Sequence, residues 1–256
     1  MMTSHPRSLR HALAGVVIAL LGALALPPAL AGDAVRPAAA TALFNGRDLA
    51  GWTVVGKDGD PAALATWTVR DGVLTASGSP YGYLRTDRAY RDYVLRVEWR
   101  WVPGAPPVEA NGKPRGRNSG VLLHMHGDDK VWPGCLEAQL QEGNAGDFIA
   151  MAPAIVFDEL TAFREKSAAA AGADEAAKQR ALTARRIARQ HESSEKPVGE
   201  WNTYEIVCRD ASVTLTVNGV LQNTATGLTV TEGTIALQSE GMPIEFRRVE
   251  LAPLAP

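Results

Sequence analysis

The sequence is poor in cysteine: only Cys135 and Cys208 occur among its 256 residues. Two cysteines cannot build the disulfide network that replaces a hydrophobic core in many small secreted domains. A buried apolar core must therefore hold this fold together. Each cysteine stands in the middle of a different strand-like segment, but nothing in the sequence fixes the geometry that a bridge requires. Their pairing stays open.

An excess of positive charge is also missing. The formal net charge is −2 at pH 7, and it becomes more negative once the basic N-terminal segment described below is removed. Proteins that bind nucleic acid or an anionic membrane surface through their charge carry a basic excess instead. We therefore predict neither kind of partner.

Several motifs of well-known enzyme classes are absent from the sequence. There is no G-x-S-x-G nucleophile elbow, no H-E-x-x-H zinc motif, no C-x-x-C, no P-loop and no G-x-G-x-x-G after a strand. These absences argue against the hydrolases, metalloproteases, redox proteins and nucleotide-binding enzymes that the motifs identify.

The N-terminus carries the one long hydrophobic run. Residues 5–11 (HPRSLRH) form a basic lead, residues 12–26 (ALAGVVIALLGALAL) an apolar run, and residues 27–31 (PPALA) an A-x-A-like cleavage site. This pattern predicts a signal peptide, residues 1–31, cut after Ala31, because the apolar run is too short for a membrane span. We expect a periplasmic or secreted protein without membrane insertion after cleavage, and residues 32–42 as a flexible lead-in.

Short strand-like segments separated by turn residues dominate residues 43–254. Residues 67–76 (WTVRDGVLTA) indicate a hairpin around Asp71-Gly72, and Asn218-Gly219 marks another. Many short strands with frequent turns predict an all-β domain, an antiparallel β-sandwich. Residues 158–191 differ, because they are rich in Ala, Glu, Lys and Arg, which favour helix, with an interruption near Gly172. We predict a helical insertion there.

Two neighbouring segments each combine an apolar and a polar face. In residues 121–126 (VLLHMH), alternation places Leu122, His124 and His126 on one side of a strand. In residues 135–141 (CLEAQLQ), it places Glu137 and Gln139 on one side. His-x-His can present two imidazoles to a metal or substrate, and a carboxylate beside a carboxamide suits sugar hydroxyls. A solvated sheet face or a hydrogen-bonded histidine pair explains the same pattern.

Four further groups of polar residues are candidates for the same site. They are Glu98 and Arg100 in the alternating segment 93–101, Arg117 and Asn118 before the histidines, Gln238 and Glu240 in phase on a later strand, and Asp147 in a glycine-rich turn. A ladder of surface ion pairs explains the first group equally well, and an aspartate in such a turn often accepts backbone hydrogen bonds. A polar sheet face in a secreted sandwich points to carbohydrate.

Several blocks of the sequence occur in the order of a known family. They are LFNGRDLAGWTV, WTVRDGVLTASG, GYLRTDRAYRDYVLRVEWRW, RNSGVLLH, PGCLEAQLQEGNAGDF, SSEKPVGEWNTYEIVC, VNGVLQN and GTIALQSEGMPIEFRRVEL. Over residues 41–252 the chain resembles the 3-keto-disaccharide hydrolase family. The resemblance implies a concanavalin-like (lectin/glucanase) β-sandwich, or jelly roll. The Ala-rich segment around residues 165–190 departs from the family pattern as a variable insertion.

The resemblance also implies an activity on glycosides whose sugar carries a ketone at C3. The ketone acidifies the C2 hydrogen, so that a base can remove it and the C1 aglycone can leave; water can then add, for net hydrolysis. We assign the role of base to His124 or Glu137, and stabilisation of the enolate oxygen to Arg117 or a divalent metal ion. Glu240 is assigned a second role in proton transfer.

The other candidates are assigned to substrate binding: Asn118, Gln139, Gln238, His126, Glu98, Arg100 and Asp147, together with Arg117. The only cofactor that the chemistry suggests is a divalent metal ion. The substrate would be an oxidised glycoside, and a sugar 3-oxidoreductase would have to supply its ketone.

Two other functions suit the same fold. A laminarinase-like glycosidase needs E-x-D-x-x-E, with catalytic carboxylates about 5 Å apart. Residues 137–142 (EAQLQE) have Gln139 in place of the central aspartate, which disfavours a direct retaining mechanism. A non-catalytic lectin-like carbohydrate-binding module explains the fold and the polar face as well as an enzyme does, and turnover separates the two.

Overall fold

The computed structural model of the protein describes residues 33–104, 116–151 and 155–255. The predicted signal peptide and its cleavage site therefore lie outside the described residues. Within these three ranges, no helix is long and apolar enough to cross a membrane.

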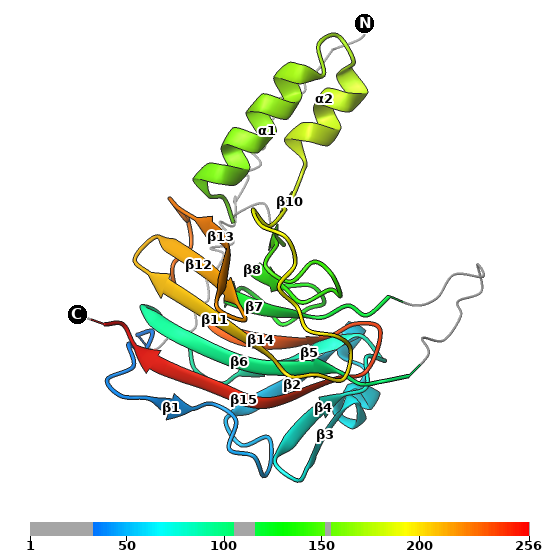
Figure 1. The fold of residues 1–256 in the computed structure, drawn as a ribbon, viewed down its shortest axis with the longest axis vertical. Helices are drawn as coiled ribbons and strands as arrows, with labels where there is room; N and C mark the ends of the chain where they lie inside the picture. Colours follow the sequence, from blue (N-terminus) through cyan, green and yellow to red (C-terminus); the bar gives the residue numbers. More distant parts are fainter. Residues whose placement is uncertain (1–32, 105–115, 152–154, 256) are drawn as a thin grey trace, which may run out of the picture. The chain divides into compact units, whose positions relative to one another are not determined.

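Two antiparallel sheets form a β-sandwich of the jelly-roll type, which confirms the predicted fold class (Figure 1). The first, the β6 sheet, has the order β13 (Val220–Ala225), β12 (Ser212–Val217), β11 (Asn202–Arg209), β6 (Tyr93–Trp101), β15 (Ile244–Pro253), β4 (Val73–Ala76) and β3 (Trp67–Arg70), with β1 (Thr41–Ala42) paired to β15. The second, the β7 sheet, has the order β10 (Arg186–Ile187), β9 (Phe148–Ala150), β8 (Gly134–Gln139), β7 (Gly120–His126), β14 (Thr234–Ser239), β5 (Gly82–Thr86) and β2 (Trp52–Gly56).

Alternation of apolar and polar residues builds the core between the sheets. Along β6, buried residues alternate with half-exposed ones from Tyr93 to Trp101, as predicted. On β8, Leu136 and Ala138 join the same core. A smaller apolar cluster lies on the opposite face of the β7 sheet, and we call it the outer-face cluster. Its buried members are Tyr83, Leu122, Met125, Cys135 and Ala236.

The predicted helical insertion is present as two helices, α1 (Asp158–Ala170) and α2 (Glu175–Leu182). Gly172 between them has a left-handed backbone with φ 58°, a conformation that glycine adopts without steric cost. The base of α1 is anchored, because Leu160 is fully buried and the Thr226 N–H donates to Glu159 Oε2 at 2.9 Å. No residue of α2 is buried.

Residues 33–42, predicted as a flexible lead-in, are instead tied to the sandwich. Val35 forms a bridge with Tyr90, Arg36 pairs with Asp92 at 2.7 Å, and β1 pairs with β15. The prediction rested on an alanine-rich composition. Composition could not show that distant backbone groups offer this segment hydrogen-bond partners.

The two cysteines are free and buried. Cys135 belongs to the outer-face cluster, whereas Cys208 lies in the main core, so no bridge joins them. Burial raises the pKa of both thiols, and both are therefore held in the unreactive protonated form.

Candidate active site

The outer face of the β7 sheet carries a buried carboxyl group, Glu137 on β8. Its register partners are Leu122 and Ile149, on the face predicted from alternation. Glu137 is 2% exposed, and no described residue hydrogen-bonds its Oε1. Beside it on β7, a Cβ on Gly120 would lie 2.4 Å from that oxygen. The glycine thus leaves the space that the carboxyl group occupies.

The electrostatics of Glu137 differ from those of a surface glutamate. Burial raises its pKa to about 8, and the nearby negative charge of Glu240 adds to the rise, whereas the Arg185 guanidinium opposes it. Burial also raises the pKa of Glu240. A carboxyl group with a pKa near neutrality exists in both protonation states, so it can accept and release protons at working pH.

Amide groups from two other segments lie next to this carboxyl pair. Gln238 on β14 stands beside Gly120, because the neighbouring residues Leu237 and Val121 are register partners. Gln238 is fully buried, and neither its Oε1 nor its Nε2 has a hydrogen-bond partner among the described residues. Such buried polar atoms are costly unless something satisfies them. They therefore require a partner that the described residues do not supply.

Asn118 and Ser119 connect the start of β7 to the end of β14. Asn118 forms a bridge with Glu240, and Ser119 Oγ donates to the Gln238 backbone oxygen at 2.7 Å. Asn118 Oδ1 is buried and receives no hydrogen bond from the described residues. The predicted residues Glu137, Asn118, Gln238 and Glu240 are therefore brought together.

His124 does not join this group, which corrects the prediction that it shares a face with Glu137. Leu123 pairs with Leu136, whereas His126 pairs with Gly134. β7 thus contains one extra residue, a β-bulge, and His124 has a left-handed φ of 51°. A bulge reverses the alternation beyond it. The His124 side chain consequently turns toward the core.

The surroundings of the His124 ring confirm its inward orientation. The ring packs edge-on against Tyr93 of β6, at 6.3 Å between centroids, and Nδ1 donates to the Val230 oxygen at 3.0 Å. Burial lowers its pKa to about 4. The ring is therefore neutral at physiological pH and separated from the carboxyl pair.

His126 and Arg117 have hydrogen-bond partners of their own, away from Glu137. His126 Nδ1 donates to the His124 oxygen at 3.0 Å, and the residue lines a cavity of about 320 Å³ that also involves Arg85. Arg117 contacts Glu142 Oε2 at 3.0 Å and donates to the Gly104 oxygen at 2.7 Å. Its two terminal nitrogens are thus engaged with the neighbouring loops, whereas Nε is buried without a hydrogen-bond partner among the described residues.

Gln139 and Asp147 each have hydrogen-bond partners within the protein, and their predicted role in substrate binding stays a prediction. Gln139 Oε1 accepts hydrogen bonds from the next two backbone N–H groups, each at 2.8 Å. Asp147 is fully buried, accepts from the Arg189 N–H at 2.8 Å and pairs with Arg186. It anchors the segment that follows the helical insertion.

We expect Asp147→Ala to lower the free energy of unfolding by about 3 kcal/mol, because it removes a fully buried carboxylate that accepts hydrogen bonds from Arg186 and from the Arg189 N–H. The midpoint of urea unfolding measures this change. Glu98→Ala is the matched control, since that carboxylate is partly exposed and its loss should cost under about 1 kcal/mol. Equal midpoints for the two variants would contradict the anchoring role.

Glu98 and Arg100 lie on the outer face of the opposite sheet. Their alternation along β6 is as predicted, but Glu98 pairs with Arg247 and Arg248, and Arg100 pairs with Glu245. The structure therefore places these two residues in a surface ion-pair ladder and away from Glu137.

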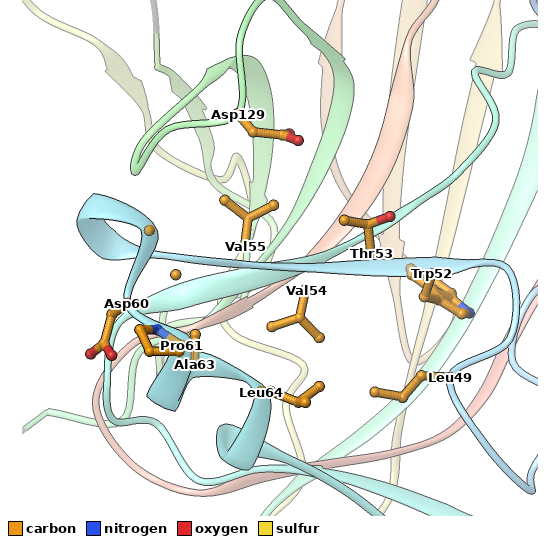
Figure 2. Close-up of a pocket in the computed structure, with 12 residues that line it drawn as sticks. Leu49, Trp52, Thr53, Val54, Val55, Asp60, Pro61, Ala63, Leu64 and Asp129 are labelled. Atoms are coloured by element: carbon orange, nitrogen blue, oxygen red, sulfur yellow. The ribbon is translucent and has the colours of Figure 1, made fainter.

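A cavity of about 640 Å³ lies at the edge strand β2, beside the short 3₁₀ helices η1 (Lys57–Gly59) and η2 (Pro61–Thr66). In Figure 2, Thr53 and Val55 point toward Asp129, while apolar side chains of β2, η2 and the preceding loop lie on the other side of the strand. Glu137 does not line this cavity. The acid–base site is thus identified by its chemistry and not by the size of a hollow.

Across the three described ranges, no three histidine, cysteine, aspartate or glutamate side chains come together in a way that could hold a metal ion. The pair Glu137 and Glu240 alone does not make such a site. The described residues therefore do not fit the divalent metal ion that the resemblance allowed.

The sequence prediction did not include Gly120 or Arg185, both of which act on Glu137. An isolated glycine in a strand is a signal of close approach by another group, so Gly120 could have been identified. Arg185 follows the helical insertion, and no local pattern connects it to β8.

Two comparisons place the chain among known proteins. The family model of the 3-keto-alpha-glucoside-1,2-lyase-like domain matches residues 39–252. Two proteins from Parabacteroides distasonis, provisionally described as glycosyl hydrolases, superpose with TM-scores of 0.54 and 0.52 at 20% and 17% identity. They cover 85% and 84% of this chain, and 94% and 99% of their own.

The carbohydrate-binding module CBM66 from Bacillus subtilis also superposes, with a TM-score of 0.50 at 11% identity over 78% of this chain and 94% of its own. At such identities these structures show a shared fold and nothing more. Curated proteins gave no significant match. The family model spans nearly all of residues 33–255, and the chain therefore belongs to the 3-keto-alpha-glucoside-1,2-lyase-like family of carbohydrate-active proteins.

Proposed function

We propose that this protein cleaves glycosides whose sugar is oxidised to a ketone at C3, by removing the C2 proton and eliminating the C1 aglycone. The buried carboxyl group of Glu137 carries this proposal, because its pKa of about 8 suits a base and its Oε1 has no partner among the described residues. Removal of a carbon-bound proton beside a ketone requires a base that is ionised yet basic near neutral pH. The family membership supports the same chemistry.

In the first step, the Glu137 carboxylate takes the proton from C2. The electron pair of that C–H bond forms the C2=C3 double bond, and the ketone oxygen becomes an enolate. Gln238 Nε2, which has no protein partner within the described ranges, can donate hydrogen bonds to this oxygen. Fixed donors aimed at a developing oxyanion lower the barrier.

In the second step, the C3 carbonyl re-forms and the double bond moves to C1=C2 as the C1–O bond breaks. The leaving oxygen takes its proton from Glu240, whose burial raises its pKa and so favours the protonated form. Addition of water across C1=C2 then gives net hydrolysis. Asn118 Oδ1 remains available to accept a hydrogen bond from a sugar hydroxyl.

The test compares an aryl 3-keto-glucoside with its unoxidised parent. We expect the enzyme to release the phenol from the keto compound and to leave the parent intact, because only the ketone makes the C2 hydrogen acidic. Cleavage of the parent would favour a direct glycosidase. Binding of keto-glycosides without any turnover would favour the lectin-like module.

The pH dependence should follow the protonation state of Glu137. Only the carboxylate is a base, so kcat/KM for the aryl keto-glucoside should rise with pH and level off above about 8. An activated phenolate leaves without help from a general acid. The ionisation of Glu240 should therefore not affect this pH profile. A limb that falls through pH 8 would show that Glu137 acts as an acid instead.

Two variants should move the rising limb of the kcat/KM profile in opposite directions. Glu240→Gln removes a group whose negative charge, when it is ionised, raises the pKa of Glu137, so the limb should shift to lower pH. Arg185→Gln removes the positive charge that opposes the rise, so the limb should shift to higher pH. Shifts in the same direction would contradict the charge arrangement.

We also propose that the protein works outside the cytoplasm after signal-peptide cleavage. The support is the N-terminal pattern alone, and sequencing of the exported protein should find Gly32 as its first residue. An enzyme that oxidises the C3 hydroxyl of a glycoside must then act before this one.

A further inference from the structure

The loop of residues 127–133, which joins β7 to β8, is fastened to β5 through Asp129. Arg85 Nε donates to Asp129 Oδ1 at 2.8 Å, and Arg85 Nη2 donates to Oδ2 at 2.9 Å. Tyr83 Oη adds a hydrogen bond to Oδ1 at 3.3 Å. A guanidinium that grips both oxygens of a carboxylate fixes orientation as well as distance. The hydrogen bonds from Arg85 lower the pKa of Asp129 and so keep it ionised.

The same loop places Trp132 over the sheet. Its ring lies 6.5 Å from that of Tyr83, at an interplanar angle of 35°. Trp132, Val131 and Met151 pack on the outer-face cluster. Trp132 remains partly exposed, so part of its indole ring is presented to solvent at a fixed position.

This surface borders the acid–base site. Leu122 of the outer-face cluster is the register partner of Glu137, and Tyr83 is the register partner of Gln238. Tyr83, which Trp132 packs against, is therefore an immediate neighbour of the amide proposed to hold the enolate, and Leu122 of the same cluster is a neighbour of the base. A sugar ring over Glu137 would have to lie alongside the tryptophan.

We propose that Trp132 is the wall against which the sugar ring packs, and that the Arg85–Asp129 ion pair is a positioning device that holds this wall in place. The role of Trp132 rests on the proposed function, whereas the fastening of the loop does not. Sugar rings expose C–H groups on their faces, and an indole offers a broad apolar partner for them at a small cost in conformational entropy.

The fastening is tested by limited trypsin digestion, because the loop contains the exposed Lys130. Arg85→Gln breaks the ion pair without changing the loop, and cleavage after Lys130 should become about tenfold faster as the loop opens. Arg96→Gln is the matched control, since Arg96 pairs with Glu205 at 3.0 Å on the other sheet. An unchanged cleavage rate in Arg85→Gln would overturn the fastening.

The wall is tested by kinetics on the aryl 3-keto-glucoside. Arg85→Gln and Trp132→Ala should each raise KM about tenfold with kcat altered less than about threefold, because they remove binding and not the base. Trp132→Phe should recover most of the loss. The KM of the double variant should be no higher than that of Trp132→Ala, because Arg85 acts through the tryptophan.

The outcomes separate the two proposals. If the wild type does not turn over any keto-glycoside but Arg85→Gln is cleaved faster, the proposed function fails while the fastening stands. If the wild type is active and Arg85→Gln opens the loop without raising KM, the wall is overturned. A fall in kcat alone in Trp132→Ala would overturn it too.

Discussion

Replacement of Glu137 by glutamine should reduce turnover of the aryl 3-keto-glucoside by at least about a thousandfold, because no carboxylate then stands above C2 to remove the proton. Glutamine has nearly the same shape and keeps the contact with the glycine at position 120. Substrate binding should therefore persist, with KM changed little. Steady-state kinetics at pH 8.5, where the wild-type base would be mostly ionised, measures the loss.

The same substitution should make the folded protein more stable at alkaline pH. An isolated glutamate has a pKa of 4.5, and burial raises that of Glu137 to about 8, so the folded state binds the proton more tightly than the unfolded chain. The contribution of that proton to the free energy of unfolding is fully present below pH 4.5 and is lost as the pH rises to about 8. The loss is on the order of a few kcal/mol, because each pKa unit corresponds to about 1.4 kcal/mol.

Glutamine carries no proton to lose, so the gain of the variant over the wild type should grow between pH 5 and pH 8. Urea unfolding at several pH values measures it. Glu205→Gln, in a half-exposed pair with Arg96, is the control and should show no comparable trend. Full activity in Glu137→Gln would show that Glu137 is not the base. A difference in the free energy of unfolding that does not change with pH would show that the pKa of Glu137 is not raised by burial.

Local patterns in the sequence predicted most of the sandwich, because one face of each sheet packs on the core. β6 and β8 follow their alternation throughout, and the Asp71-Gly72 turn joins β3 and β4 as expected. Burial of one face fixes the register of a strand, since a slip of one residue would expose its apolar side chains. The face that holds Glu137 could therefore be identified from sequence alone.

His124 shows where this reasoning fails. VLLHMH alternates as regularly as any strand in the chain, yet an extra residue in β7 turns the histidine to the other face. A bulge is set by both neighbouring strands, and here the pairing with β14 shifts at the same place. Alternation within a single segment carries no information about such a mismatch.

The charge state of Glu137 was equally out of reach of local patterns. Its pKa depends on burial, on Glu240 and on Arg185, and these come from strands and loops far apart in the sequence. Periodicity gives the side on which a side chain points, whereas its chemistry depends on what else arrives at that side.

Gly120→Ala should lower kcat/KM by about a hundredfold, although it removes no functional group, because misplacement of a catalytic group by about an ångström is costly. The added Cβ would lie 2.4 Å from Glu137 Oε1, 2.7 Å from Cγ and 2.8 Å from Cδ. Contacts this short with three atoms of one side chain cannot be relieved by a small torsion. The carboxyl group must move as a whole.

Gly116→Ala is the matched control, because a Cβ at that nearby glycine meets no atom within 4 Å. It should leave kcat/KM within about twofold, as expected of a surface substitution far from special contacts. The double variant Gly120→Ala/Glu137→Gln should be no slower than Glu137→Gln alone, because the glycine acts only through the carboxyl group and such effects are not additive. Additive losses would show that Gly120 contacts the substrate itself, and unchanged activity in Gly120→Ala would show that the carboxyl group can work from a second position.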